Sequence, residues 1–529
     1  MNLVVGSGPA GVSCAMALLQ RGAEVTLLDV GVDLEPDKKA LLDRLGSAEP
    51  EQWQPADLKM LKEPSQPNFK GLPKKLVYGS DYSFRWLDTA RPLVQQNTDT
   101  LASNALGGLS NAWGANLIPL QDADHQQWPV SREEIAAGYR AVLDFVPVSE
   151  GPDGLTKHYP LYGKGDFQLP IGNQAKFMLQ RLTANETSLR AAGIEFGRTR
   201  LAVWPRGRRD EKGCRQCQLC LFGCPYELIY SAAHTMPELR KNPRFHYRSG
   251  VLAERFDERG GKAILTVRNI SGGALEEVAG ERLYLGCGAI GTGAIVLNSS
   301  NEPGRTLRLR DSRYFLVPVI LDESVSGVTG EKLLSLSQLM FRITHPALRG
   351  TTAHLLLYTY NELFHQLFSK LTRFVPLAGD IIKEYMLGRF VVFQGYLHSE
   401  FSPSLELSLD TDSKGAERVL LAGKDLDRGA AEARTVLKGL SQFRKALGGR
   451  MIMPLLQGAL PGKSYHLGSS LPMKASPQAF ETDSEGRLFG YRRVHVVDSS
   501  VLPSIPASNP TFAVMANAYR IGRLSVDSI

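Results

Sequence analysis

Short apolar runs at the start of the chain alternate with a glycine-rich turn and a helical stretch. Residues 3–5 form an apolar run of strand length, residues 12–20 have helical spacing, and residues 24–28 form a second short run. Short apolar runs bounded by turn residues are typical of buried strands. The order strand, glycine-rich turn, helix, strand predicts the opening of an α/β fold with a parallel sheet.

A second group of regular elements is predicted near the end of the chain. Residues 494–497 have the pattern of a strand, and residues 511–524 have the apolar spacing of a helix. Pro503, Pro506 and Pro510 fall between them. They predict a loop there, because proline lacks the N–H group that a helix interior or a central strand uses.

The middle of the chain has the pattern of an antiparallel sheet with helices. Residues 393–410 alternate apolar and polar positions, which predicts a half-buried strand pair. Residues 431–447 have the pattern of one amphipathic helix with basic residues on its polar face. Residues 32–75 are polar and contain proline, so we expect a surface excursion there.

Residues 354–393 are unusually rich in large apolar side chains, several of them at helical spacing on one face. The favoured interpretation is a buried helix that covers the functional site. The second interpretation is an amphipathic element that makes peripheral contact with a membrane or admits a lipid-like substrate.

Composition and charge narrow the class of protein. The chain has 529 residues, 43% hydrophobic and 22% charged, as in ordinary soluble globular proteins. This length exceeds what one core supports, so two connected domains are expected. The net charge of +7 is scattered, which argues against a nucleic-acid surface. The early first strand leaves no segment for a signal peptide, and no apolar run reaches about 18 residues. We therefore expect a cytoplasmic protein, which the membrane interpretation would place at the inner face.

The first turn has the spacing G-x-G-x-x-G, at Gly6, Gly8 and Gly11. In a dinucleotide-binding turn the first glycine permits the tight turn, and the second lets the backbone approach a pyrophosphate. The third lets the helix pack closely on the strand, and the helix N-terminus presents free N–H groups to the phosphates. Asp29 ends the second strand and can accept hydrogen bonds from both ribose hydroxyls. The motif fits FAD or NAD, and its place at the N-terminus favours FAD.

Four of the six cysteines lie in one segment, residues 213–226. Their spacing, C-x2-C-x2-C-x3-C-P, is that of an iron–sulfur run in bacterial ferredoxins. We expect an iron–sulfur cluster on Cys214, Cys217, Cys220 and Cys224. A structural zinc site and a metal-free loop are the alternatives. A cluster would pass electrons to a protein or quinone acceptor.

Two C-terminal segments carry further motifs: SYHLGSSLPM, around position 466, and VHVVDSSVLPSIPASNPTFAVMANAYRIGRLS, from residue 494. They resemble the C-terminal region of the glucose–methanol–choline (GMC) family of FAD oxidoreductases. It implies that His466 faces the flavin N5 and that Asn509 lies beside it. It implies that Asp498 contacts the ribityl or phosphate part of the flavin. The helix start at Asn509, Pro510 and Thr511 would bring backbone amides toward the pyrimidine edge of the flavin.

Other segments match the same family. LGGLSNAWGANLIPL resembles its glycine-rich flavin-covering segment, and YRSGVLAERF resembles the strand that contacts the adenine, here through Val251. The residues that the first of these implies near the phosphates and ring are Gly107, Gly108, Ser110 and Asn111. QQWPVSREEIAAGYRAVLDF resembles the helix that opens the substrate domain, and LYLGCGAIGTGAIVLNSS is a looser match. A subset of the family has a similar four-cysteine loop, from which this chain departs after Cys224.

The resemblance implies an α/β protein with a discontinuous, Rossmann-like FAD-binding domain and an interleaved α+β substrate domain on an antiparallel sheet. The FAD domain is expected from residues 1–120, 201–300 and 461–529, and the substrate domain from residues 121–200 and 301–460.

The function implied is FAD-dependent oxidation of a CH–OH group in an alcohol, sugar or lipid-like substrate, by hydride transfer to flavin N5. His466 would be the base, because an imidazole titrates near neutrality, and Asn509 would hold the substrate oxygen. Three alternatives stay open. They are an oxygen-using oxidase of the family without a cluster, an electron-transfer subunit without turnover, and an enzyme that reduces a double bond with electrons from the cluster.

Overall fold

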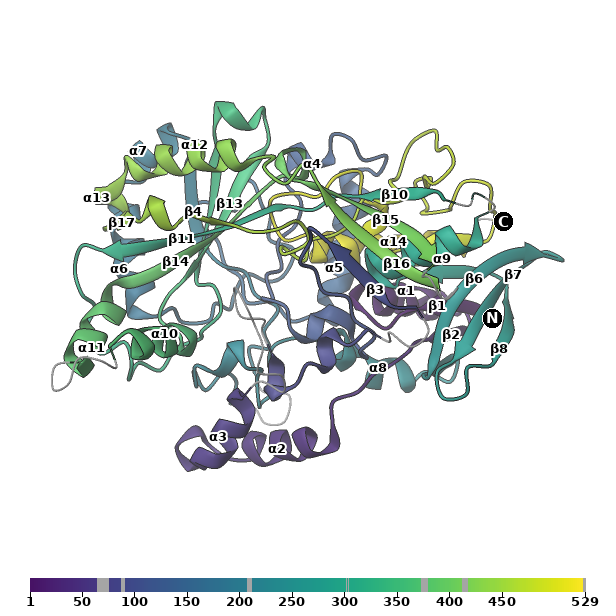
Figure 1. The fold of residues 1–529 in the computed structure, drawn as a ribbon, viewed down its shortest axis with the longest axis horizontal. Coiled ribbons are helices and arrows are strands. Elements are labelled where there is room, and N and C mark those ends of the chain that lie inside the picture. Colours follow the sequence, from purple (N-terminus) through teal and green to yellow (C-terminus); the bar gives the residue numbers. More distant parts are fainter. Residues whose placement is uncertain are drawn as a thin grey trace.

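A five-stranded parallel sheet brings together the two ends of the chain and its middle. The computed structural model describes residues 1–63, 76–86, 91–206, 212–300, 302, 304–372, 379–411 and 417–526. The strand order is β19-β9-β1-β2-β5, with every pairing parallel. The strands are β1 (Asn2–Val5), β2 (Val25–Leu28), β5 (Phe245–Arg248), β9 (Leu283–Leu285) and β19 (Val494–Val496). Both termini lie in this half of the molecule (Figure 1).

Helices from distant parts of the sequence pack around this sheet. They are α1 (Pro9–Gln20), α5 (Arg132–Leu143), α8 (Met236–Arg240), α9 (Gly288–Ser299) and α14 (Thr511–Leu524). α14 packs against both α1 and α5. A Cβ added at Gly522 would lie 2.8 Å from the carbonyl oxygen of Cys14, so glycine allows α14 to approach α1 this closely. The helix predicted over residues 511–524 is confirmed.

A three-stranded antiparallel meander extends this half of the molecule. It consists of β6 (Val251–Arg259), β7 (Lys262–Asn269) and β8 (Leu275–Gly280). The strand expected through Val251 is interrupted before that residue, because Gly250 has a φ of +77° and turns the chain from β5 into β6.

A seven-stranded antiparallel sheet forms the other half of the molecule. Its order is β17-β11-β14-β13-β12-β4, with β18 paired to β11. Its strands are β4 (Ile194–Arg198), β11 (Arg313–Leu321), β12 (Leu339–Thr344), β13 (Thr352–Tyr358), β14 (Phe390–Leu397), β17 (Gly449–Met451) and β18 (Gln457–Gly458). The helices near it include α6 (Asn173–Ala184), α7 (Glu186–Ala191), α12 (Ala430–Ser441) and α13 (Arg444–Leu447). Met178, Phe341 and Leu437 belong to the core between sheet and helices. The predicted fold class, α/β with an added antiparallel sheet, is confirmed.

A four-stranded sheet draws on both halves of the sequence. Its order is β10 (Thr306–Leu309), β15 (Ser404–Thr411), β16 (Glu417–Lys424), β3 (Leu93–Gln96). The prediction that residues 393–410 form two strands paired with each other is therefore wrong. β14 lies in the seven-stranded sheet and β15 in this one. Alternation shows that a strand is half-buried, but it does not identify the neighbouring strand.

Two predicted helical segments differ in detail. Residues 431–447 form two helices, α12 and α13, which share one core, so their apolar pattern looks continuous. Residues 354–393 contain the end of β13, then α10 (Glu362–Thr372) and α11 (Gly379–Arg389), then the start of β14. The expected single buried helix is wrong. Figure 1 shows α10 and α11 at the end of the molecule opposite the β6–β8 meander. Residues 373–378 lie outside the described part.

The expected excursion over residues 32–75 contains α2 (Pro36–Gly46) and α3 (Pro55–Lys62), which project from one side of the molecule in Figure 1. A short helix, α4 (Asp122–His125), precedes α5. Of the helices in the described ranges, none combines the length and apolar character needed to cross a bilayer.

Candidate active site

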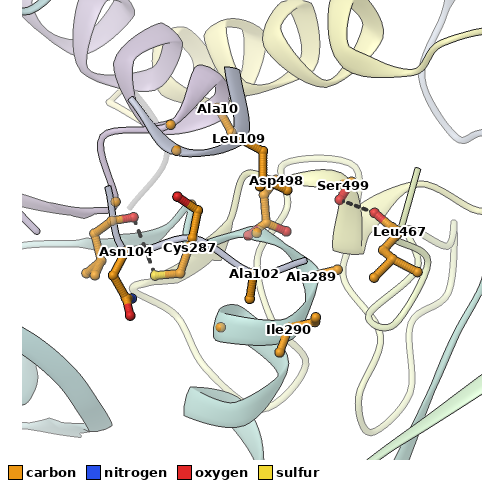
Figure 2. A pocket seen from close by; sticks show the side chains of 18 of the residues that line it. Ala10, Ala102, Asn104, Leu109, Cys287, Ala289, Ile290, Leu467, Asp498 and Ser499 are labelled. Carbon is orange, nitrogen blue, oxygen red and sulfur yellow. Dashed lines mark hydrogen bonds between the residues drawn. The ribbon is translucent and has the colours of Figure 1, made fainter. Parts of the chain in front are cut away.

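A cavity of about 250 Å³ lies at the carboxyl edge of the parallel sheet. Ligands of doubly wound α/β folds bind at this edge, where the loops leave the strands. The predicted site residues that line it are Gly6, Gly8, Asp29, Gly108, Val251, His466, Asp498, Pro510 and Thr511. Figure 2 shows Asp498 and Cys287 pointing into this cavity from different segments.

The three glycines of the first turn meet different constraints. Gly6 has a φ of +95°, and a Cβ on it would lie 2.6 Å from the carbonyl oxygen of Gly286. A Cβ on Gly11 would lie 1.8 Å from the carbonyl oxygen of Gly6, so only glycine lets α1 start this close to β1. A Cβ on Gly8 would have nothing within 4 Å, and Gly8 lines the cavity. Space is thus left open at the start of α1, where free N–H groups favour phosphate.

Asp29 is buried at the end of β2 and is linked through Ser7 to Gly107. The Ser7 hydroxyl donates to the Asp29 carboxylate, and the backbone N–H of Gly107 donates to Ser7 Oγ at 3.0 Å. Burial raises the pKa of Asp29 to about 7. Sequence reasoning missed Ser7, although it lies inside the glycine motif.

The segment around Gly107 and Gly108 is held by its own side chains. Ala232 N donates to Ser110 Oγ at 2.9 Å. Asn111 Nδ2 donates to the carbonyl oxygens of Leu106 and Gly108, both at 2.9 Å. Gly108 lines the cavity, whereas Ser110 and Asn111 stabilise the segment from behind. These two residues were expected close to the phosphates and ring.

Asp498 follows β19 and faces the cavity beside the start of α9. It accepts a hydrogen bond from the Thr292 hydroxyl and one from Ser500 N at 2.9 Å. Burial raises its pKa. Pro510 and Thr511 line the same wall at the start of α14.

His466 and Asn509 come together although they lie in different loops. Asn509 Nδ2 is 3.0 Å from His466 Nε2. The Ser312 hydroxyl donates to the carbonyl oxygen of Pro506 at 2.8 Å, and Ser312 Oγ is 3.2 Å from His466 Nδ1. Since the single hydroxyl proton of Ser312 is used, Ser312 accepts from Nδ1–H. The lone pair of the imidazole is therefore on Nε2, which faces Asn509.

The surroundings of His466 keep its imidazole neutral. Its ring stacks on Tyr396, with 4.8 Å between centroids and 26° between planes. Burial lowers the pKa of His466 to about 3, and neighbouring His354 adds to this effect. His354 on β13 is fully buried, and within the described residues neither of its ring nitrogens has a hydrogen-bond partner. The same holds for Asn509 Oδ1. Buried polar atoms without a protein partner, such as these, are rare in folded proteins, and their presence near His466 indicates that a ligand binds there.

The loop that carries His466 is fixed by a buried carboxylate. The Ser464 hydroxyl donates to Asp311, and Gly462 N donates to the same carboxylate at 2.7 Å. Ser464 Oγ in turn accepts from His466 N at 2.9 Å. Tyr465, between them, has a φ of +60°, a strained conformation that concentrates at functional sites. Sequence reasoning missed Asp311 and Ser312, because both lie more than a hundred residues before the histidine.

The four cysteines of the loop lie near one another without forming a metal site. Each thiol is close enough to the other three to influence a pKa electrostatically. Burial raises the pKa of Cys224 to about 11. Gln216 N donates to Cys214 Sγ and Leu228 N to Cys224 Sγ, both at 3.4 Å. In the part of the chain that the structure describes, no group of three or more His, Cys, Asp or Glu is arranged to hold a metal ion. The thiols as they stand do not fit the expected cluster.

Two solved structures share the overall fold. Pyridoxine 4-oxidase from Mesorbium loti has a TM-score of 0.58 and 13% sequence identity, over 99% of this chain and 98% of that one. An FAD-dependent oxidoreductase from Chaetomium thermophilum has a TM-score of 0.54 and 13% identity, over 98% of each chain. At this identity the similarity is one of fold.

Sequence comparisons point to one family. Residues 424–518 match the family model described as GMC oxidoreductase. The chain is 31% identical over 112 residues to the GMC-type oxidoreductase y4nJ of Sinorhizobium fredii (strain NBRC 101917 / NGR234), over 17% of this chain and 22% of that protein. It is 24% identical over 368 residues to 6'''-hydroxyparomomycin C oxidase of Streptomyces lividus, over 63% of this chain and 62% of that protein. The chain thus covers less than two thirds of either relative. The family match over residues 424–518, these relatives and the shared fold show that the chain is similar to proteins of the GMC oxidoreductase family.

Proposed function

We propose that the protein binds FAD and oxidises a CH–OH group of an uncharged alcohol, sugar or lipid-like substrate. The observation that carries this proposal is the arrangement of His466 and Asn509, which places an imidazole lone pair beside an amide at the wall of a dinucleotide-type cavity. Gly6, Gly8, Gly11, Asp29, Gly108, Val251, Asp498, Pro510 and Thr511 would hold the cofactor. Gly107, Ser110 and Asn111 would support it through the segment that they brace. FAD, when bound, supplies the hydride acceptor.

The protein's own residues can accept the proton that the substrate hydroxyl loses. The substrate hydroxyl donates to His466 Nε2, and Asn509 Nδ2 turns from that nitrogen to the substrate oxygen. Nε2 takes the proton as the C–H bond breaks, and the Nδ1–H bond to Ser312 keeps the ring in the tautomer that can do so. Asn509 Oδ1, which has no hydrogen-bond partner among the described residues, can accept a hydrogen bond from a second group of the substrate.

The residues around His466 favour a substrate without charge. Tyr314 and Tyr358 lie on the same face of the seven-stranded sheet as Tyr396, and burial raises the pKa of all three. Neutral phenols next to a neutral imidazole provide hydrogen bonds and apolar contact without an ion-pair partner. This wall fits the uncharged hydroxyl compounds named above.

The experiment that tests the function is anaerobic mixing of the FAD-loaded protein with a panel of primary alcohols, sugars and sterols. Loss of the flavin absorbance with stoichiometric carbonyl product supports it. A flavin that none of these compounds reduces would favour the electron-transfer subunit without turnover. Peroxide formed in air would identify the oxidase alternative, which the oxidase names of two similar proteins favour.

The rate of flavin reduction is expected to be constant between about pH 5 and pH 8. The base must be neutral to accept a proton, and its activity falls as the pH drops through its pKa. Because the pKa of His466 is lowered to about 3, this loss lies below the window. Stopped-flow reduction across the window checks this. A rate that falls to half near pH 6.5, the pKa of an ordinary histidine, and about tenfold one pH unit lower would contradict it.

We propose separately that the four-cysteine loop can rearrange to hold an iron–sulfur cluster, which would supply a route for electrons to a protein or quinone. The ferredoxin spacing and the proximity of Cys214, Cys217, Cys220 and Cys224 support it, although the loop would have to close around the cluster. Anaerobically purified protein is then expected to contain iron and sulfide in fixed ratio to flavin, both lost in Cys217→Ser. Zinc in place of iron and sulfide, or no metal at all, would exclude this route of electron transfer.

Two further assignments are also proposals. The discontinuous division into FAD and substrate domains is supported by the separate sheets, although the sheet containing β3 draws strands from both predicted domains. Peripheral contact of residues 354–393 with a membrane is supported by four exposed apolar side chains, those of Leu367, Ile381, Ile382 and Tyr385.

A further inference from the structure

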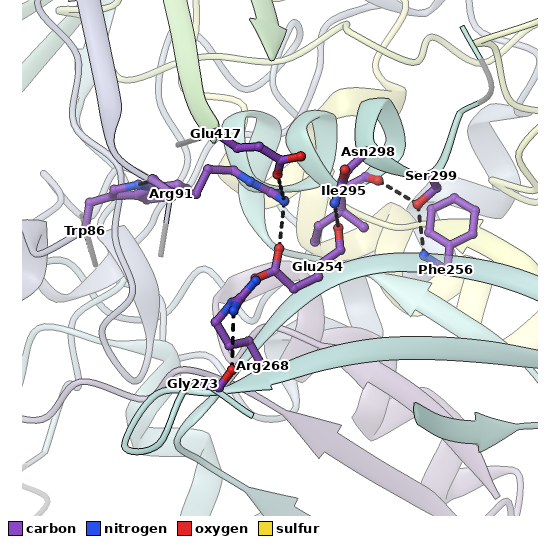
Figure 3. A network of polar contacts seen from close by, with 10 residues as sticks. All are labelled: Trp86, Arg91, Glu254, Phe256, Arg268, Gly273, Ile295, Asn298, Ser299 and Glu417. Carbon is purple, nitrogen blue, oxygen red and sulfur yellow. Dashed lines mark hydrogen bonds and ion pairs between the residues drawn. The ribbon is translucent and has the colours of Figure 1, made fainter. Parts of the chain in front are cut away.

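Arg91 joins three separate segments at one end of the cavity. Its Nη2 group lies 2.7 Å from Glu254 on β6 and 3.1 Å from Glu417, the first residue of β16 (Figure 3). Arg91 is 5% exposed, and it stands just before β3, the strand that pairs with β16. Glu254 is also buried and accepts a second bond from Arg268 Nε. Arg91 is thus fixed by two ion pairs, both of which its Nη2 group makes.

The Nε group of Arg91 is left without a protein partner. Within the described residues this buried N–H donates to nothing, although the side chain lines the cavity. Its neighbours on the cavity wall include Trp86, whose Nε1 donates to the Arg91 carbonyl oxygen at 2.9 Å, and the backbone of residues 251–253. A buried donor without a partner is destabilising, so the place of this N–H group on a cavity wall favours a ligand that accepts its hydrogen bond.

We propose that Arg91 binds the adenine half of FAD, donating from Nε to an acceptor nitrogen of the adenine ring. This inference rests on the proposed FAD binding and extends it to a residue outside the glycine motif. The position of Arg91 in the cavity indicates that it contacts the adenine half of FAD rather than the flavin half. Arg91 lies beside the residues that follow Val251, and Asp29 lines the same cavity, whereas His466 belongs to the part where the flavin ring would react. Adenine presents ring nitrogens as acceptors and no charge.

The ion pair alone does not require arginine at this position. A lysine could satisfy Glu254 and Glu417 with its ammonium group, but it has no N–H at the position of Nε. Lysine therefore separates the contact to the ligand from the contact that joins the three segments. Glu417 provides the matched control, because it is 57% exposed and touches Arg91 from the side of the second sheet.

The test compares Arg91→Lys and Glu417→Gln with the wild-type protein. The apoproteins are titrated with FAD, with ADP for the adenine half, and with FMN for the flavin half. Arg91→Lys is expected to weaken FAD and ADP binding about tenfold to hundredfold and to leave FMN binding unchanged. Glu417→Gln is expected to change none of the three by more than about twofold. Equal affinities of Arg91→Lys and wild type for ADP, or an equal loss for ADP and FMN, would overturn the inference.

A measurement on the wild-type protein covers the case in which Arg91→Lys does not fold. FAD analogues with carbon in place of N1, N3 or N7 of the adenine are titrated against the same apoprotein. One of the three is expected to bind about tenfold or more weakly than FAD. Equal affinity for all three would refute the contact, whereas failure of the wild type to bind FAD at all would refute the proposed function instead.

Discussion

Replacing His466 with alanine is expected to slow the reduction of bound flavin by alcohol about a hundredfold to ten-thousandfold. The imidazole, which lies beside Asn509 and has a lowered pKa, is the base that we propose, and its loss would leave the hydroxyl proton without an acceptor. FAD affinity is expected to change little, because the residues around the phosphates and ribose lie on other segments. Stopped-flow reduction at saturating alcohol gives the rate, and titration of the apoprotein gives the affinity.

His345→Ala is the control for this substitution. His345 lies in the turn between β12 and β13, where its Nδ1 accepts from Ala347 N at 3.1 Å. Its loss should leave flavin reduction within about twofold of wild type, since it removes a half-buried helix cap rather than a base. A wild-type rate of flavin reduction in His466→Ala would show that another group accepts the hydroxyl proton of the substrate. Equal losses in both variants would point to a general effect on the fold.

Local patterns in the sequence predicted elements whose cause is local. Residues 511–524 form a helix because their apolar spacing matches the helical period, and the Asn-Pro turn before it sets its start. Gly6, Gly8 and Gly11 could be identified from the spacing of the dinucleotide-binding turn, and at Gly6 and Gly11 the structure leaves no room for a Cβ atom. The family resemblance brought His466 and Asn509 into view, and the structure places them 3.0 Å apart.

Contacts between distant segments could not be predicted in this way. Tyr396 and His354 face each other across β13 and β14, and their approach to His466 depends on how the two halves of the molecule pack. The same limit explains the error over residues 393–410, since a period of two is identical in any sheet. Nothing in the sequence around Arg91 singles it out, because its position in the cavity depends on ion pairs with Glu254 and Glu417, which are distant in the chain.

Replacing Gly11 with alanine is expected to destabilise the protein by about 3 kcal/mol or more, above the usual cost of added core volume. The new methyl group would lie 1.8 Å from the carbonyl oxygen of Gly6, and that oxygen belongs to backbone rather than to a side chain that can rotate away. Relief requires α1 to move off β1, the central strand of the parallel sheet. Urea unfolding of the apoprotein measures the loss.

Gly8→Ala separates folding from cofactor binding in the same turn. Because no atom lies within 4 Å of the added methyl group, the apoprotein is expected to unfold at the wild-type urea concentration. The methyl group occupies the space at the start of α1 where a pyrophosphate would approach the backbone, so FAD affinity is expected to fall about tenfold or more. Unchanged FAD affinity in Gly8→Ala would contradict the position assigned to the phosphates. A stable Gly11→Ala protein would show that α1 can shift without breaking its contact with β1.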